Sequence, residues 1–148
     1  MTENQFVGTW RLVSFEFKDA EGQTLYPYGQ DAIGYLMYTA DRYMSAHIMK
    51  ANRSHFATFD ISAGTQEEQA LATQSYIAYC GLYEIQDNKV IHHVQASLFP
   101  NWMGGRQERF FEFKSDHLVL STPPLLVGSK QQTAYLIWKR VKTDLRGA

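Results

Sequence analysis

Short apolar runs separated by turn residues make up the pattern along most of the chain. The runs are rich in aromatic and β-branched side chains, which are the residue types typical of strands. Gly, Pro, Asn and Asp occur singly or in pairs between them. The runs are WRLVSFEFK, AIGYLMYT, RYMSAHIMK, IAYCGLYEI, KVIHHVQASLF, RQERFFEFK, HLVLST and TAYLIWKR. We therefore predict about eight strands joined mostly by tight connections.

Strands in such a succession favour an up-and-down antiparallel meander. Closing the meander into a barrel removes the exposed edges that an open sheet would present. No repeat, low-complexity tract or linker interrupts residues 1–148, and this length suits one domain. The predicted fold is an all-β, closed or nearly closed antiparallel barrel that forms a single domain.

One segment has a helical pattern instead. Thr65 precedes the run by one position and Glu68 follows three residues later, which is the spacing of a capping box. We predict a helix from Gln66 to about Ser75. Ala70, Leu71 and Gln74 fall at helical spacing, so the helix could pack as a lid or plug on one barrel mouth. A solvated connector is the plainer alternative.

Composition and charge narrow the classes of function. Aromatic residues make up 14% of the chain, a share that suits strands around a wide interior. The 14 basic and 15 acidic side chains give a net charge of −1, which disfavours nucleic acid as a partner. The sequence has no leader pattern at MTENQFVGTW and no apolar run of about 18 residues, so we expect a cytoplasmic protein without a membrane span. Cys80 is the only cysteine, which excludes an internal disulfide and a zinc site of paired thiolates.

Two short pieces at opposite ends resemble the lipocalin-type signature. Gly8-Thr-Trp10 opens the first strand and Trp138-Lys-Arg140 closes the last. In calycin barrels, the indole of the first motif packs across the closed end and an arginine of the last strand lies over it. The resemblance therefore implies these structural roles for Trp10 and Arg140, and a guanidinium on an indole face is a favourable contact.

Longer pieces resemble a narrower group, the small bacterial and fungal lipocalin-like domain proteins. The pieces are GTWRLVSFE, PYG, GYLMYTADRYMSA, YIAYCGLYE, HHVQASLFPNWMGGRQER and IWKR. Together they cover most of the chain. The resemblance implies the barrel fold, but it supplies no catalytic residue to transfer.

The adjacent pair His92 and His93 offers the clearest candidate chemistry. Neighbouring side chains on a strand point to opposite faces, so one imidazole faces the interior. His92 shares its face with Val94, Ala96 and Leu98, and we expect that face to line the cavity. An interior imidazole has a pKa open to tuning near neutrality. A hydrogen-bonded structural histidine is the alternative.

Tyrosines on two other strands could supply hydroxyl groups. Tyr79 and Tyr83 share one face, and Gly81 between them would leave space for a ligand. We expect packing for Tyr83, whereas Tyr79 is open to either role. Tyr43 and His47 share a mixed face of the strand RYMSAHIMK and are further candidates for the cavity.

Arg109 is a candidate anchor for a ligand. Its face of the strand RQERFFEFK also carries phenylalanines, so an inward guanidinium would be costly without a carboxylate. That carboxylate could be Glu84, Glu16 or a bound acid. An exposed Arg109 is equally compatible with the sequence.

The segment Phe99-Pro-Asn-Trp-Met-Gly-Gly105 has the composition of a loop at the barrel rim. Trp102 and Met103 could fold over the mouth as an apolar gate, and the two glycines would give the backbone freedom to move. Trp102 could equally be a core plug. Both residues are therefore candidates for contact with a ligand.

Metal and cofactor sites are not indicated by the sequence. The histidines are His47, His55, His92, His93 and His117, and none forms an HxH or HExxH pair. No nucleophile elbow, phosphate-binding glycine loop or dinucleotide motif occurs. We expect no cofactor. Phe15 and Phe17 share one face of the first strand, which hints at an outward apolar patch and a homodimer.

These observations support a barrel that binds a small hydrophobic molecule. The alternative is a cofactor-free isomerase or cyclase acting on a hydrophobic biosynthetic intermediate, with His92 and either Tyr79 or Tyr43 moving a proton. A third possibility is a solidly packed barrel that serves as an interaction module.

Overall fold

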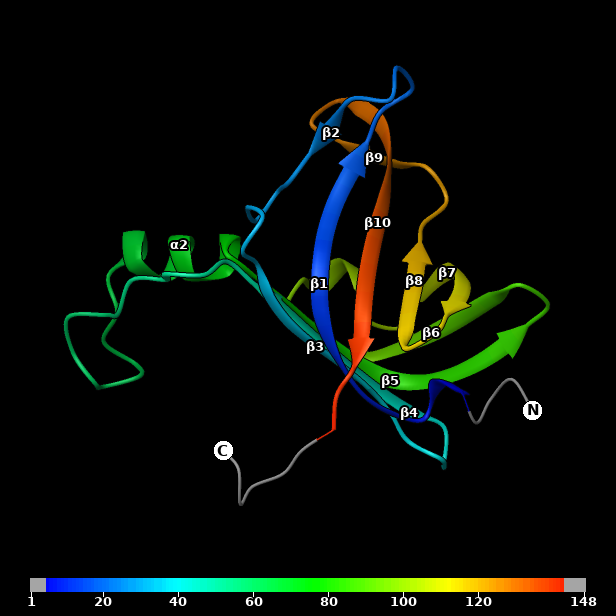
Figure 1. Ribbon diagram of the computed structural model, residues 1–148. Helices are drawn as coiled ribbons and strands as arrows, with labels where there is room; N and C mark the ends of the chain where they lie inside the picture. Colours follow the sequence, from blue (N-terminus) through cyan, green and yellow to red (C-terminus); the bar gives the residue numbers. More distant parts are fainter. Residues whose placement is uncertain (1–4, 143–148) are drawn as a thin grey trace.

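A computed structural model describes residues 5–142 (Figure 1). The elements in chain order are β1 (Gly8–Lys18), β2 (Thr24–Leu25), β3 (Ile33–Tyr38), β4 (Tyr43–Met49), α2 (Gln66–Gln74), β5 (Tyr76–Gln86), β6 (Lys89–Ser97), the 3-10 turn η1 (Pro100–Trp102), β7 (Arg106–Lys114), β8 (His117–Ser121), β9 (Leu125–Val127) and β10 (Lys130–Arg140). Within this part of the chain, no helix is long and apolar enough to cross a membrane.

The strands form a closed antiparallel barrel. They follow one another in the order β2-β1-β3-β4-β5-β6-β7-β8-β10-β9, and β1 also pairs with β10. That last pairing runs from Trp10 opposite Arg140 to Lys18 opposite Thr133 and closes the wall. The predicted all-β meander is therefore confirmed, and the two short strands β2 and β9 extend one end of it.

Alternation along each strand separates the interior from the outer wall. On β3, Gly34, Leu36 and Tyr38 are buried, whereas the intervening Ile33, Tyr35 and Met37 are exposed. Strand β4 repeats the pattern with Met44, Ala46 and Ile48 inside. One face of the closed sheet surrounds the core, and successive side chains on a strand point to opposite faces. On β3 and β4 the even-numbered residues therefore point inward and the odd-numbered residues point outward.

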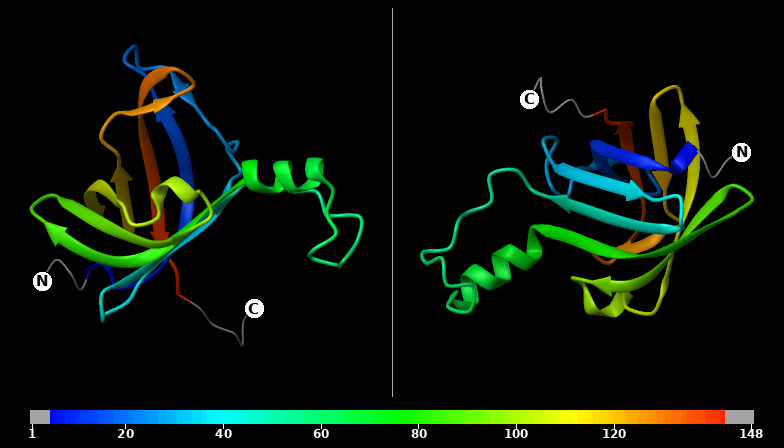
Figure 2. Two further views of the ribbon diagram at one scale, coloured as in Figure 1. Left: turned by 180° about the vertical axis from the view of Figure 1, so that it is seen from behind. Right: turned by 90° about the horizontal axis from the view of Figure 1, so that it is seen from below.

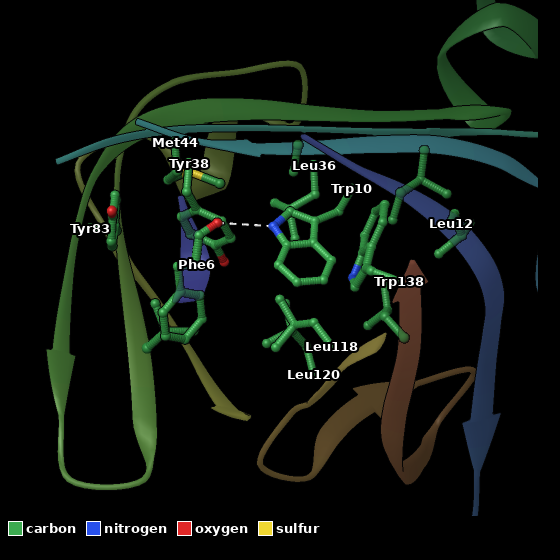
Figure 3. Packing of buried hydrophobic residues seen from close by; sticks show 14 of the residues in the cluster. Phe6, Trp10, Leu12, Leu36, Tyr38, Met44, Tyr83, Leu118, Leu120 and Trp138 are labelled. Carbon is green, nitrogen blue, oxygen red and sulfur yellow. Dashed lines mark hydrogen bonds between the residues drawn. The ribbon is translucent and has the colours of Figure 1, made fainter. Parts of the chain in front are cut away.

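One end of the barrel is filled by aromatic side chains (Figure 3). Phe6 is fully buried, and its carbonyl oxygen accepts a hydrogen bond of 2.9 Å from Trp10 Nε1. Arg140 Cζ lies 4.2 Å from the centre of the Trp10 ring, and Nη1 donates to the Val7 carbonyl at 2.8 Å. Gly8 has a φ of +137°, and a Cβ there would lie 2.8 Å from Arg140 Nη1. The Gly-x-Trp motif and the terminal arginine thus build one closed end.

Helix α2 forms where the sequence predicted a helix. Thr65 Oγ1 accepts from the Glu68 amide and the Glu68 carboxylate accepts from the Thr65 amide, which completes the capping box. The helix has no buried residue and projects sideways from the barrel (Figures 1 and 2). It is therefore a solvated connector between β4 and β5, and the idea of a lid or plug over the barrel mouth is wrong.

Strand β1 differs from expectation at its apolar end. Phe15 is buried and Phe17 is half-buried against the core, with their ring centres 5.4 Å apart. Both rings face the interior because the β1 register shifts between Leu12 and Ser14 opposite β10. They do not form the outward patch on which the expectation of a homodimer was based.

A second irregularity reverses the facing of residues on β6. The pairing with β5 shifts between Cys80 and Gly81, so Gly81 lies opposite Val94 while Cys80 lies opposite Ala96. A Cβ at Gly81 would lie 1.9 Å from the His93 carbonyl oxygen, so this close approach requires glycine. Beyond the shift Ala96 is exposed, and Leu98 is also exposed. The expectation that these two line the cavity is wrong.

Candidate ligand-binding site

The other half of the barrel encloses a cavity of about 630 Å³. Its wall is mostly apolar and comes from Phe15, Phe17, Leu36, Ala46, Ile48, Ile77, Leu120, Ala134, Leu136 and Trp138. Its rim is formed by Phe99 and Trp102 on one side and by Pro123, Leu125, Leu126 and Val127 on the other. Leu36, Leu120 and Trp138 line the cavity and also belong to the packed cluster of Figure 3, so the cavity borders that cluster directly. An interior with this volume is not a solidly packed interaction module.

His92 projects from β6 toward this cavity between two tyrosine hydroxyls. Its Nε2 lies 2.7 Å from the hydroxyl of Tyr38 on β3, and its Nδ1 lies 2.7 Å from the hydroxyl of Tyr79 on β5. The exposed fractions are 1% for His92, 2% for Tyr38 and 7% for Tyr79. Tyr79 and His92 line the cavity, whereas Tyr38 lies behind them in the packed half.

Burial keeps these three groups neutral. Desolvation lowers the pKa of His92 well below its usual value, and the nearby positive charges of Arg109 and His93 lower it further. Burial also raises the pKa of Tyr38 well above its usual value. The imidazole therefore carries one proton, so one ring nitrogen donates and the other accepts.

Arg109 extends inward from β7 to the same cluster. Its Nη1 donates to the Glu108 carbonyl at 2.9 Å, and its Nη2 donates to Gln107 Oε1 at 3.1 Å. Its positive charge also lowers the pKa of Tyr79, against the larger raising effect of burial. A guanidinium offers more N–H donors than these contacts use. The remaining donors belong to a side chain that lines the cavity.

No carboxylate balances this guanidinium among the described residues. Glu84 lies 2.7 Å from His93 Nε2, and Glu16 lies 3.8 Å from Lys18 Nζ. These were the two acidic side chains that the sequence offered as partners for Arg109. Of the three carboxylates considered for Arg109 in the sequence, a bound acid is therefore the one left.

Aromatic side chains flank the polar cluster at the rim. Trp102 lies in the turn η1 and meets Tyr79 edge-on, with ring centres 5.7 Å apart. Phe99 meets Trp102 in the same way at 5.3 Å. Trp102 is half-buried and lines the cavity, so it borders the entrance as the sequence suggested. The rim therefore presents aromatic surface directly beside the polar groups.

Three residues named from the sequence lie away from the cavity. Tyr43 is 50% exposed on the outer face of β4, and His47 on the same face contacts Tyr76 and Ser45. Met103 follows η1 and is 57% exposed without lining the cavity. The buried positions of β4 have even numbers, so parity places Tyr43 and His47 outside.

The contact of Tyr38 with His92 was not predicted from the sequence. It lies 54 positions from His92 and comes from a strand that suggested no chemistry. Its parity with Leu36 indicates an inward side chain, but only the pairing of the strands shows which imidazole it meets. The residues Leu125–Val127 lie outside the strands predicted from the sequence, but they form β9 and line the cavity.

Comparison with known proteins gives the following similarities. The chain is 36% identical over 107 residues to the 4'-hydroxy-3'-methoxypropiophenone carrier protein ppsC of Aspergillus oryzae, and this match covers 66% of the chain and 96% of that protein. Among solved structures, a lipocalin-like protein from Bacteroides uniformis has 11% identity and a TM-score of 0.48, with 93% of this chain and 99% of that one covered. An uncharacterized protein from Bacteroides eggerthii has 14% identity and a TM-score of 0.46, with 90% and 98% covered.

The family model of the lipocalin-like domain matches residues 7–141. This span begins just before Gly8 and ends just after Arg140, the two residues that meet at the closed end of the barrel. Almost the whole described barrel lies within it. The chain therefore belongs to the lipocalin-like domain family, as its sequence motifs indicated.

Proposed function

We propose that this protein binds and carries a small hydrophobic molecule with a polar head inside its barrel. The observation that carries the proposal is the cavity of about 630 Å³, which combines an apolar wall with a polar cluster at one place. This volume lies in the range of small-molecule sites, which usually combine mostly apolar lining with a few polar groups that fix orientation.

The related protein supports the same function. It is named for carrying 4'-hydroxy-3'-methoxypropiophenone, an aromatic ketone with a phenol and a methoxy group. Such a molecule has an aromatic body that suits Phe99 and Trp102 and oxygen atoms that suit Tyr79 and Arg109. We propose an aromatic or similarly apolar body for the ligand of this chain as well.

The geometry favours binding over the alternative of an isomerase or cyclase. Both nitrogens of His92 already hydrogen-bond tyrosine hydroxyls, so the ring has no free nitrogen for a substrate. Tyr43, the alternative partner for proton transfer, lies on the outer wall. The proposal therefore assigns the polar cluster to recognition.

A fluorescent probe tests this function. Nile red should gain emission when mixed with the protein, and 4'-hydroxy-3'-methoxypropiophenone should displace it. Ala46 is buried and lines the cavity, so Ala46→Phe should fill part of the cavity and weaken uptake. Ser45 is its neighbour on the outer face of β4, so Ser45→Phe adds the same ring outside and should keep uptake.

Two outcomes would contradict the proposal. One is a folded wild-type protein that takes up no Nile red. The other is equal uptake by the Ala46→Phe and Ser45→Phe variants, because the probe would then bind outside the barrel. Circular dichroism of each variant confirms that the barrel is intact.

A further inference from the structure

The Tyr38 hydroxyl has a single hydrogen-bonding partner among the described residues. That partner is His92 Nε2, and the tyrosine is only 2% exposed. Its neighbour Tyr83 donates its own hydroxyl proton to the Thr39 carbonyl. If Tyr38 does not donate to Nε2, its proton is buried without an acceptor, which is costly.

This constraint selects the tautomer of His92. When Tyr38 donates to Nε2, the single ring proton lies on Nδ1 and is donated to the Tyr79 oxygen. The opposite tautomer would leave the Tyr38 proton unpaired in the packed half of the barrel. Only with the ring proton on Nδ1 do the Tyr38 hydroxyl and the His92 N–H both donate to an acceptor.

The same tautomer determines what Tyr79 offers to the cavity. Its oxygen accepts from His92 Nδ1, and the nearby Arg109 guanidinium is itself a donor, so the Tyr79 proton has no acceptor in the cluster. Tyr79 lines the cavity, as does Arg109 with its remaining N–H donors. Within this cluster, the groups that face the cavity are therefore hydrogen-bond donors. Gln107 and Glu108 also line the cavity, but Gln107 Oε1 accepts from Arg109 Nη2 and Glu108 Oε1 accepts from Lys89 Nζ.

We infer that the polar head of the ligand is an oxygen that accepts hydrogen bonds and carries no proton, a ketone or a carboxylate oxygen, held by the Tyr79 hydroxyl and the Arg109 guanidinium. Tyr38 acts as a positioning residue, because it sets the direction of the hydrogen bonds without touching the ligand. The inference rests on the proposed function and specifies its ligand class. A hydroxyl head could accept through its oxygen, but its own proton would have no acceptor in this cluster, so it should bind more weakly.

Probes with one carbon skeleton test the direction of these hydrogen bonds. Propiophenone, 1-phenyl-1-propanol and propylbenzene differ only in carrying a ketone, a hydroxyl or no polar atom. We expect propiophenone to displace Nile red at about tenfold lower concentration than the other two. A second pair, 3-phenylpropanoate and 3-phenyl-1-propanol at pH 7.5, extends the comparison to a carboxylate.

Variants assign the preference to named groups. Tyr79→Phe removes the donor and should abolish the preference for propiophenone over 1-phenyl-1-propanol. The control Tyr83→Phe alters an inward ring on the same strand that does not line the cavity, and it should keep the preference. Arg109→Gln should weaken 3-phenylpropanoate more than propiophenone, whereas Arg11→Gln on the outer face of β1 should change neither.

Nitrogen chemical shifts of the imidazole test the tautomer without any ligand. We expect the proton of His92 on Nδ1 in the wild-type protein. Tyr38→Phe removes the constraint, so it should shift the tautomer signal and reduce the ketone preference while Nile red still binds. A role of Tyr38 in packing alone would leave the tautomer and the preference unchanged.

The outcomes separate the inference from the proposed function. If the protein takes up Nile red, three results would overturn the inference and leave the carrier function standing. They are equal binding of the ketone and the alcohol, preferred binding of the alcohol, and no displacement of Nile red by the ketone. A proton on Nε2 in the wild-type protein would overturn it as well. Failure to take up Nile red at all would overturn the carrier function and the inference with it.

Discussion

The neutral, buried His92 makes the stability of the barrel depend on pH. In the unfolded chain its imidazole has an ordinary pKa near 6.5, whereas burial lowers the pKa well below that value in the folded protein. Below pH 6.5 the unfolded chain binds a proton that the folded chain excludes. Acid therefore favours unfolding, and the contribution of this residue to stability is complete only above the unfolded pKa.

The magnitude follows from the two protonation equilibria. Between the folded and unfolded pKa values, the free energy of unfolding falls by about 1.4 kcal/mol for each pH unit. With the folded ring neutral throughout the range, the loss between pH 7.5 and pH 5 is about 2 kcal/mol. The groups that face the ring are Tyr38, Tyr79 and Arg109, and none of them changes charge in this interval.

Urea unfolding followed by tryptophan fluorescence measures the effect from pH 7.5 to pH 5. The His92→Gln variant keeps a donor and an acceptor between the two tyrosines but cannot be protonated, so its stability should change about 2 kcal/mol less than that of the wild type. His93→Gln is the matched control, because His93 lies next in sequence on the outer face and meets Glu84. The stability of His93→Gln should still fall toward pH 5, because His92 is unchanged in this variant. The exposed Glu84 and Glu108 have lowered pKa values and titrate below this window.

A neutral, buried His92 would be contradicted if the free energies of unfolding of the wild type and His92→Gln fell equally between pH 7.5 and pH 5. A neutral His92 would also be contradicted if His93→Gln, and not His92→Gln, removed the loss of stability in acid. Either result would mean that the buried imidazole accepts a proton in the folded barrel and that the two tyrosines do not hold it neutral.

Two further predictions concern the closed end and the helix. Gly8→Ala places a side chain at a φ of +137° and against Arg140 Nη1, so it should lower the free energy of unfolding by about 1–3 kcal/mol. Gly22→Ala also has a positive φ but has open space around it, so it should lower the free energy of unfolding less. Equal losses in urea titrations would contradict a role for the Arg140 contact. Thr65→Ala removes the N-terminal cap of α2, a helix with no buried residue. Amide exchange over 66–74 should therefore accelerate while the Tm of the barrel stays the same. A lowered Tm would show that α2 stabilises the barrel.

The barrel was predictable because its evidence is local. Each strand carries its own alternation, and the motifs around Trp10 and Arg140 mark its first and last strands. The helix was equally readable, since Thr65 and Glu68 cap it through contacts three residues apart. The packing of the helix could not be predicted, because helical spacing does not show whether the barrel offers a surface for the helix to contact.

The candidate site could be predicted only in part. The inward direction of His92 followed from parity, but of the three neighbours that identified its face only Val94 is buried. The shift at Gly81 then reversed parity for Ala96, which no local pattern announces. Tyr38 could not be found, because its contact with His92 depends on the order of strands around the barrel. Whether Arg109 meets a carboxylate could not be predicted either, because that depends on the partners that Glu84 and Glu16 find in the folded barrel.

The seam between β1 and β10 has a consequence for how the chain folds. It joins the first long strand to the last one, and the Arg140 side chain bonds the Val7 carbonyl across 133 positions. Contacts between such distant residues make loop closure costly and folding slow. During synthesis, the edge of β1 also lacks one partner until β10 leaves the ribosome. The growing chain therefore exposes a strand edge, open to association with other chains, until the last strand of the barrel has been synthesised.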